Sequence, residues 1–130
     1  MILDEVQKVP ALLDEVHWLI ENEKIGFILM ELVAHAAYTE LNYRIRFWRT
    51  KSGQEVDFVH GDGEIAIEVK GSDRIDRTDL RGMNAFAEDH KPRHSILVCT
   101  ESRERLTADG IRIQPWRRFL EKLWAGEIIN

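Results

Sequence analysis

Residues 55–70 read EVDFVHGDGEIAIEVK, and this stretch decides the fold. Apolar and polar side chains alternate on both sides of Asp62-Gly63, a dipeptide that suits a two-residue type I′ turn because both central residues need a positive φ. The pattern predicts a β-hairpin in which Asp57 lies opposite Glu68. Alternation along the strands gives this hairpin one wholly apolar face, which we expect to be buried. That face carries Val56, Phe58, Ile65, Ile67 and Val69.

The other face of the predicted hairpin is polar, and two interpretations of it stay open. A solvated outer face explains most of it, but not Asp57 opposite Glu68, because like charges directly opposed destabilise a sheet. A divalent cation would reverse that effect, since Mg²⁺ takes one or two protein carboxylates and keeps several waters. Lys70 would point into the same space, where an ammonium can orient a water or stabilise phosphate charge.

Asp57 followed by Glu68-Val69-Lys70 resembles the D…(E/D)-x-K core of PD-(D/E)XK nucleases. More closely, FWRTKSGQEVDFV at residues 47–59 and IAIEVK at 65–70 resemble the C-terminal, nuclease-like domain of a family of prokaryotic AAA+-type ATPases. The resemblance extends over about residues 31–130. It implies a restriction-endonuclease-like fold with Mg²⁺ held by Asp57 and Glu68. It also implies catalytic roles for Lys70 and for Glu31, because such folds commonly place an acid on the first core helix.

The first residues, MILDE, resemble a Walker B segment, and the following VQKVPALLDEVHWLIE resembles the middle of the same family's ATPase domain. The sequence contains no G-x-x-x-x-G-K-[ST] loop to hold the phosphates. We therefore expect no ATP binding or hydrolysis, and a structural role for Asp4 and Glu5. Residues 1–25 are predicted to be an ATPase-domain remnant packed on the rest, and residues 26–130 to be the nuclease-like domain of a truncated family member.

Composition limits the class of protein. The 130 residues suffice for one domain with a substantial core. The single cysteine, Cys99, lies in the apolar run SILVC, which predicts a buried free thiol and excludes a disulfide framework. No apolar run reaches the roughly 20 residues of a membrane span, and no signal peptide opens the chain, so we expect a cytoplasmic protein without membrane contact.

The net charge of −5 is unevenly distributed. Residues 1–40 hold 8 acidic and 2 basic side chains, whereas residues 41–130 hold 15 acidic and 16 basic ones. Basic side chains flank the hairpin, so nucleic acid is permitted as a partner. A protein partner or self-association is equally allowed. The candidate phosphate contacts are Arg49, Lys51, Arg74 and Arg77.

Hydrophobic periodicity predicts a mixed α/β (α+β) architecture, a sheet of four or five strands flanked by helices. Gly26 should separate the first two helices, and the strands at 64–70 and 95–100 should run parallel because a helix connects them. The predicted helices are 10–24, 27–41, 76–90 and 115–126. The predicted strands are 43–49, 54–60, 64–70, 95–100 and a short edge strand at 111–113.

Three functions agree with these residues. The first is Mg²⁺-dependent phosphodiester hydrolysis of nucleic acid. The second is a catalytically silent nuclease-like module that serves an ATPase partner by docking or by binding nucleic acid. The third is a remnant without independent activity. The carboxylate pair and Lys70 favour the nuclease-like interpretation, and whether cleavage is retained stays open.

Overall fold

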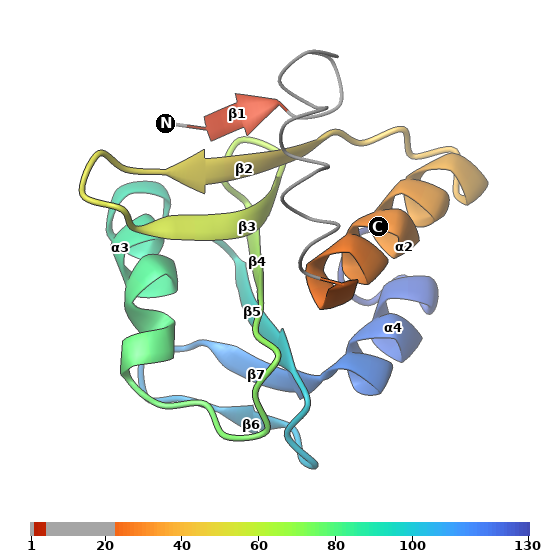
Figure 1. Ribbon diagram of the computed structural model, residues 1–130. Coiled ribbons are helices and arrows are strands. Elements are labelled where there is room, and N and C mark those ends of the chain that lie inside the picture. The colour runs from red at the N-terminus through yellow and green to blue at the C-terminus, as the bar shows by residue number, and fades with distance from the viewer. Residues whose placement is uncertain (1, 5–22) are drawn as a thin grey trace.

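The computed structural model describes residues 2–4 and 23–130 (Figure 1). Within these residues, seven strands form one mixed sheet in the order β1-β2-β3-β4-β5-β7-β6. Neighbouring strands are antiparallel from β1 to β4 and parallel across β4, β5 and β7, while β6 runs antiparallel to β7. The strands are β1 (Ile2–Asp4), β2 (Ile45–Arg49), β3 (Glu55–His60), β4 (Ile65–Val69), β5 (His94–Cys99), β6 (Arg105–Leu106) and β7 (Arg112–Pro115).

The predicted fold class, a mixed sheet flanked by helices, is confirmed, but the sheet is wider than predicted. β1 adds a strand beside β2, and β6 lies between the predicted strands at 95–100 and 111–113, where no strand was predicted. β7 therefore has a neighbouring strand on each edge, β5 and β6, and its prediction as an edge strand is wrong. The parallel pairing of β4 with β5 is confirmed.

The helices cover both faces of the sheet (Figure 1). α2 (Glu23–Tyr38) and α4 (Trp116–Trp124) lie on one side, and the short 3₁₀ helix η1 (Thr78–Leu80) and α3 (Arg81–His90) lie on the other. The predicted break at Gly26 is wrong, because α2 continues through this residue. One glycine costs a helix only about 1 kcal/mol relative to alanine, and the buried side of α2 outweighs that cost. Residues 10–22 of the first predicted helix, and most of the predicted unit 1–25, lie outside the described residues.

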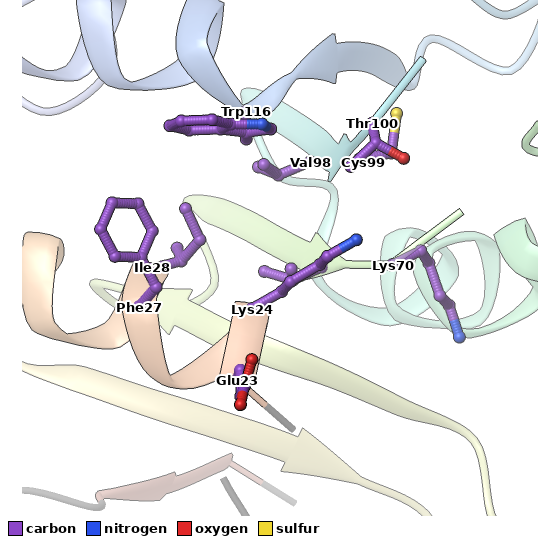
Figure 2. Close-up of a pocket in the computed structure, with 10 residues that line it drawn as sticks. Glu23, Lys24, Phe27, Ile28, Lys70, Val98, Cys99, Thr100 and Trp116 are labelled. Atoms are coloured by element: carbon purple, nitrogen blue, oxygen red, sulfur yellow. The ribbon is translucent and has the colours of Figure 1, made fainter. Parts of the chain in front are cut away.

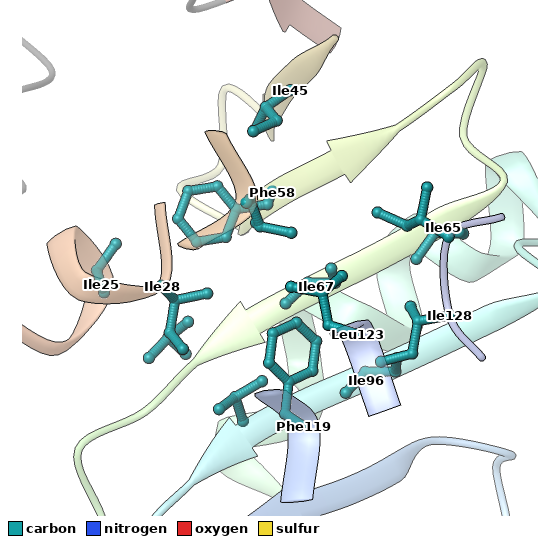
Figure 3. Close-up of a cluster of buried hydrophobic side chains, with 14 residues drawn as sticks. Ile25, Ile28, Ile45, Phe58, Ile65, Ile67, Ile96, Phe119, Leu123 and Ile128 are labelled. Carbon is teal, nitrogen blue, oxygen red and sulfur yellow. The ribbon is translucent and has the colours of Figure 1, made fainter. Parts of the chain in front are cut away.

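Two apolar clusters lie on opposite faces of the sheet. Figure 3 shows the first, in which Phe58 and Ile67 of the sheet meet Ile28 of α2 and Phe119 and Leu123 of α4. The second cluster packs η1 and α3 against the other face. All five positions of β4 are buried as a result. The second cluster comprises Trp48, Val56, Val59, Ala66, Ile75, Leu80, Met83, Phe86, Leu97, Cys99, Ile111 and Ile113.

The predicted hairpin register is confirmed, although the predicted turn is wrong. Phe58 lies opposite Ile67, and continuation of this register places Asp57 opposite Glu68. Residues 61–64 separate the two strands, and positive φ values occur at Gly61 and Gly63 but not at Asp62. The connection is thus longer than a two-residue type I′ turn. The alternation of apolar residues determines the strand register, and a type I′ turn is not needed for it.

A β-bulge in β3 corrects the prediction for Val56. Arg46 pairs with Val59 whereas Trp48 pairs with Val56, so Phe47 lies opposite two residues, Asp57 and Phe58. The extra residue reverses the alternation, and Val56 joins the cluster under α3 instead of sharing a face with Phe58.

Two expectations from composition can be compared with the structure. Cys99 is buried and carries a free thiol, as predicted. Among the residues that the structure describes, no helix has the length and apolar content needed to cross a membrane.

Candidate functional site

The bulge lies at the point where the β3–β4 ladder ends. The pairing of β3 with β4 ends at Phe58 and Ile67. At the next position a side chain replaces the backbone acceptor: Asp57 Oδ2 accepts a hydrogen bond of 2.8 Å from the Val69 N–H. The carboxylate is thereby held beside β4, one residue from Glu68. Bulges commonly re-aim a side chain next to a functional site.

Glu68 is a buried carboxylate. Its residue is only 4% exposed, because the helix layer of η1 and α3 covers this face of the sheet. Oε1 lies 3.7 Å from the Lys70 ammonium, and Oε2 is buried without a hydrogen-bond partner among the described residues. An unpartnered buried oxygen of this kind is costly. The interpretation of this face as an ordinary solvated surface is therefore wrong at Glu68.

Burial makes ionisation of both carboxyl groups costly. Burial, and then the Asp57 charge, raise the pKa of Glu68 to about 8. Burial raises the pKa of Asp57 to about 6, although the hydrogen bond from Val69 opposes this shift. At neutral pH the pair therefore carries close to one negative charge, with the proton mainly on Glu68.

A polar cleft of about 380 Å³ opens beside Glu68 and Lys70. Its walls come from the β2–β3 turn and from η1 with the first turn of α3. Gly82 lets α3 approach this closely, because a Cβ at this position would overlap with the backbone oxygen of Glu55. The residues that line the cleft are Ser52, Gly53, Gln54, Glu55, Glu68, Lys70, Thr78, Asp79, Arg81 and Gly82.

A second cavity, of about 360 Å³, lies near the same end of β4 but on the α2 and α4 side. Its walls include Phe27 and Trp116, whose rings meet edge to face with centroids 5.9 Å apart. Lys70 borders this cavity too, but its side chain points away from Trp116 (Figure 2). Because Nζ lies 3.7 Å from Glu68, we place the ammonium with the carboxylates and not with the apolar cavity.

Asp57 and Glu68 together provide the small number of protein ligands that the hard cation Mg²⁺ commonly has. The described residues contain no group of three or more Asp, Glu, His and Cys side chains arranged to hold a metal. Mg²⁺ is commonly bound by only one or two carboxylates, with water completing its shell. Asp57 and Glu68 would supply those two ligands, and the unpartnered Oε2 of Glu68 would gain a positive partner.

Glu31 does not join this site. It lies on α2, and its Oε2 accepts a hydrogen bond of 3.0 Å from the Trp124 indole N–H. α2 and α3 cover opposite faces of the sheet (Figure 1). The cleft is lined by the start of α3 and not by α2. His35, one turn further, also contacts Trp124, with ring centroids 5.0 Å apart.

The predicted phosphate contacts surround the cleft without lining it. Arg49 lies at the end of β2, with Nε 3.4 Å from Glu55 Oε2. Lys51 is exposed in the turn beside Ser52, which does line the cleft. Arg74 is exposed after β4, and Arg77 borders a different cavity, of about 570 Å³.

Arg81 lines the cleft together with Lys70, and it is missing from the predicted phosphate contacts. It follows η1, which Asp76 caps by accepting hydrogen bonds from the Thr78 and Asp79 amides at 2.9 and 3.3 Å. The cap fixes where α3 begins and thereby places Arg81 at the cleft. Aspartate is a residue type that commonly caps the start of a helix, so Asp76 is a sequence signal that could have placed Arg81, rather than Arg77, at the cleft.

The model of the DUF4143 family, described as a domain of unknown function, matches residues 26–119. The chain belongs to this family. DUF4143 domains often occur with AAA ATPases, which confirms the coarser part of the resemblance, whereas the nuclease part remains a prediction. The chain matches no curated protein and no solved structure. The match includes β2, β3 and β4, the carboxylate pair and the cleft, so the site described above belongs to the DUF4143 domain.

Proposed function

We propose that this DUF4143 domain is a Mg²⁺-dependent phosphodiesterase that acts on nucleic acid, with Asp57 and Glu68 as metal ligands. The observation that carries the proposal is the Glu68 carboxylate, buried beside Asp57 with one oxygen unpartnered. Such a pair is unfavourable by itself and becomes favourable beside a divalent cation. The bound ion would polarise a phosphoryl oxygen and lower the pKa of a coordinated water.

The protein's own groups have separate tasks in this proposal. Lys70, 3.7 Å from Glu68 Oε1, orients the attacking water or stabilises charge on the phosphate. Arg81 at the cleft wall binds a phosphate of the substrate. Arg49, Lys51, Arg74 and Arg77 lie further out and contribute charge attraction along the backbone of the nucleic acid.

A catalytically silent module is the second candidate. It is favoured by the hydrogen bond from Val69 to Asp57 and by the ion pair of Lys70 with Glu68, since each contact already occupies one oxygen of these two groups inside the protein. The absence of Glu31 from the site points in the same direction. In this case the domain would bind nucleic acid or dock on a protein partner such as an ATPase, without cleaving. For either candidate we propose no ATP binding, because the sequence lacks a phosphate-binding loop.

Two measurements separate the candidates. The first is cleavage of single- and double-stranded DNA and of RNA with Mg²⁺ or Mn²⁺, comparing the wild type with Glu68→Gln, Lys70→Met and the control Glu88→Gln. Glu88 is an exposed carboxylate of α3 outside the cleft. The proposal predicts cleavage that Glu68→Gln and Lys70→Met lower by roughly 100-fold or more, whereas Glu88→Gln does not.

The second measurement is the backbone amide spectrum during a cation titration. Shifts confined to the cleft, without cleavage of any substrate, would favour the silent module. The metal site itself would be contradicted if the cation neither shifted any amide signal nor changed the rate of cleavage.

A further inference from the structure

The outer side of α2 is apolar although it faces away from the sheet. The buried side of the helix packs Ile25, Ile28 and Leu32 into the core. On the opposite side Met30 is 67% exposed and Tyr38 is 83% exposed. Single exposed apolar residues are normal, but a continuous row along one helix marks an interaction surface. We define the outer stripe as Phe27, Met30, Ala34 and Tyr38 of α2, with Leu41 just beyond the helix end.

α4 extends this surface with an indole ring. Trp124 is 43% exposed. Its ring centroid lies 6.1 Å from that of Tyr38, and its N–H is already used by Glu31. The exposed part of Trp124 therefore offers mainly apolar contact. Tyrosine, tryptophan and methionine are the residue types that protein interfaces enrich.

We propose that the outer stripe is the interface of a symmetric homodimer in which α2 packs antiparallel against α2 of a second copy. The residues of the stripe are spaced symmetrically about Ala34. Met30 and Tyr38 lie four residues before and after it, and Phe27 and Leu41 lie seven residues before and after it. A two-fold axis at Ala34 thus places Met30 opposite Tyr38 of the second copy, and Phe27 toward its Leu41 just beyond the helix end.

The chemistry of the stripe favours a second copy over a charged partner. None of its five residues is charged, and the neighbouring Glu31 is held by Trp124. The small side chain of Ala34 on the axis allows the two helices to approach closely. Met30 would lie opposite a tyrosine, and a methionine sulfur makes favourable contacts with aromatic rings.

The exposed area agrees with a reversible dimer. With about 150–250 Å² for each aromatic side chain, the exposed parts of the stripe and Trp124 amount to roughly 600 Å² per copy. A standard interface buries about 800 Å² per partner, so we expect a dissociation constant in the micromolar range. Figure 1 shows α3 on the face of the sheet opposite to α2. The cleft, which α3 helps to line, therefore stays accessible in both copies of the dimer.

Sedimentation velocity from micromolar to several hundred micromolar protein tests the proposal. The wild type should shift from monomer to dimer with concentration. Ala34→Glu should weaken the dimer by ~100-fold, because the axis brings the two added charges together. Met30→Glu should weaken it by a similar factor, because it buries an unpaired charge opposite Tyr38 of the second copy. Leu106→Glu is the matched control, since Leu106 is an exposed apolar residue of β6, 61% exposed and away from α2. It should dimerise like the wild type.

Circular dichroism melting is the control for folding, and we expect each variant to be folded because the substituted positions are not in the core. A wild type that stays monomeric at several hundred micromolar would overturn the proposal and assign the stripe to a different protein. A dimer that survives both charged substitutions, or that Leu106→Glu alone dissociates, would overturn it as well.

Discussion

Replacing Glu68 by glutamine removes the buried negative charge and keeps the shape of the side chain. The folded protein holds the pKa of Glu68 near 8, whereas its ordinary value is 4.5. Below the pKa of the unfolded chain the carboxyl group is protonated in both the folded and the unfolded state. The wild type and Glu68→Gln should then have nearly the same free energy of unfolding. As the pH rises through the folded pKa, the unfolded chain has already lost a proton that the folded protein still binds. The wild type is therefore progressively destabilised, and the glutamine variant is not.

The size of the effect follows from the shift. At 1.36 kcal/mol per pKa unit the upper limit is about 4–5 kcal/mol. Asp57 titrates in the same range and shares the repulsion, so we expect roughly 2–4 kcal/mol of extra stability for Glu68→Gln at high pH. Urea unfolding at about pH 5 and about pH 9 measures the difference, with Glu88→Gln as the control for losing an exposed charge. Equal stabilities of wild type and Glu68→Gln at the higher pH would refute the buried, repelled carboxylate.

Further predictions concern the same region. Asp57→Asn should be neutral or slightly stabilising, because it keeps an acceptor for the Val69 N–H and removes the repulsion of Glu68, whereas Asp57→Ala should cost about 1–3 kcal/mol by leaving that N–H unpaired. Equal unfolding midpoints for the two variants would disprove this role of the hydrogen bond. Gly82→Ala should destabilise the protein by about 1–3 kcal/mol or more, because its Cβ meets the Glu55 oxygen. A melting temperature unchanged by this substitution would show that α3 can move away from β3.

The central hairpin could be predicted from the sequence because alternation determines the register. A slip of one residue would have exposed Phe58 and Ile67, and this penalty does not depend on the turn. The turn was mispredicted because Asp62-Gly63 suits a type I′ geometry locally, whereas the packing of the hairpin does not require that geometry. The side of the sheet that Val56 faces depends on the bulge, which no residue type in β3 marks.

The buried state of Glu68 could not be read from the hairpin alone. Alternation gives only the two faces of a sheet, and what covers the second face depends on η1 and α3, which come later in the chain. The same limit applies to Glu31, because the resemblance gave its place on a helix but not the direction of its side chain. Its partner, Trp124, is 93 residues away in the sequence.

The most direct test of the metal site is calorimetry of Mg²⁺ binding near neutral pH in two buffers that differ in ionisation enthalpy. Because Glu68 is protonated there in the metal-free protein, binding must displace that proton, and metal sites generally release protons in this way. We predict saturable binding to the wild type with release of about one proton per ion, and no binding to Glu68→Gln. Absence of binding up to tens of millimolar Mg²⁺, or equal binding by the variant, would contradict a metal site at Asp57 and Glu68.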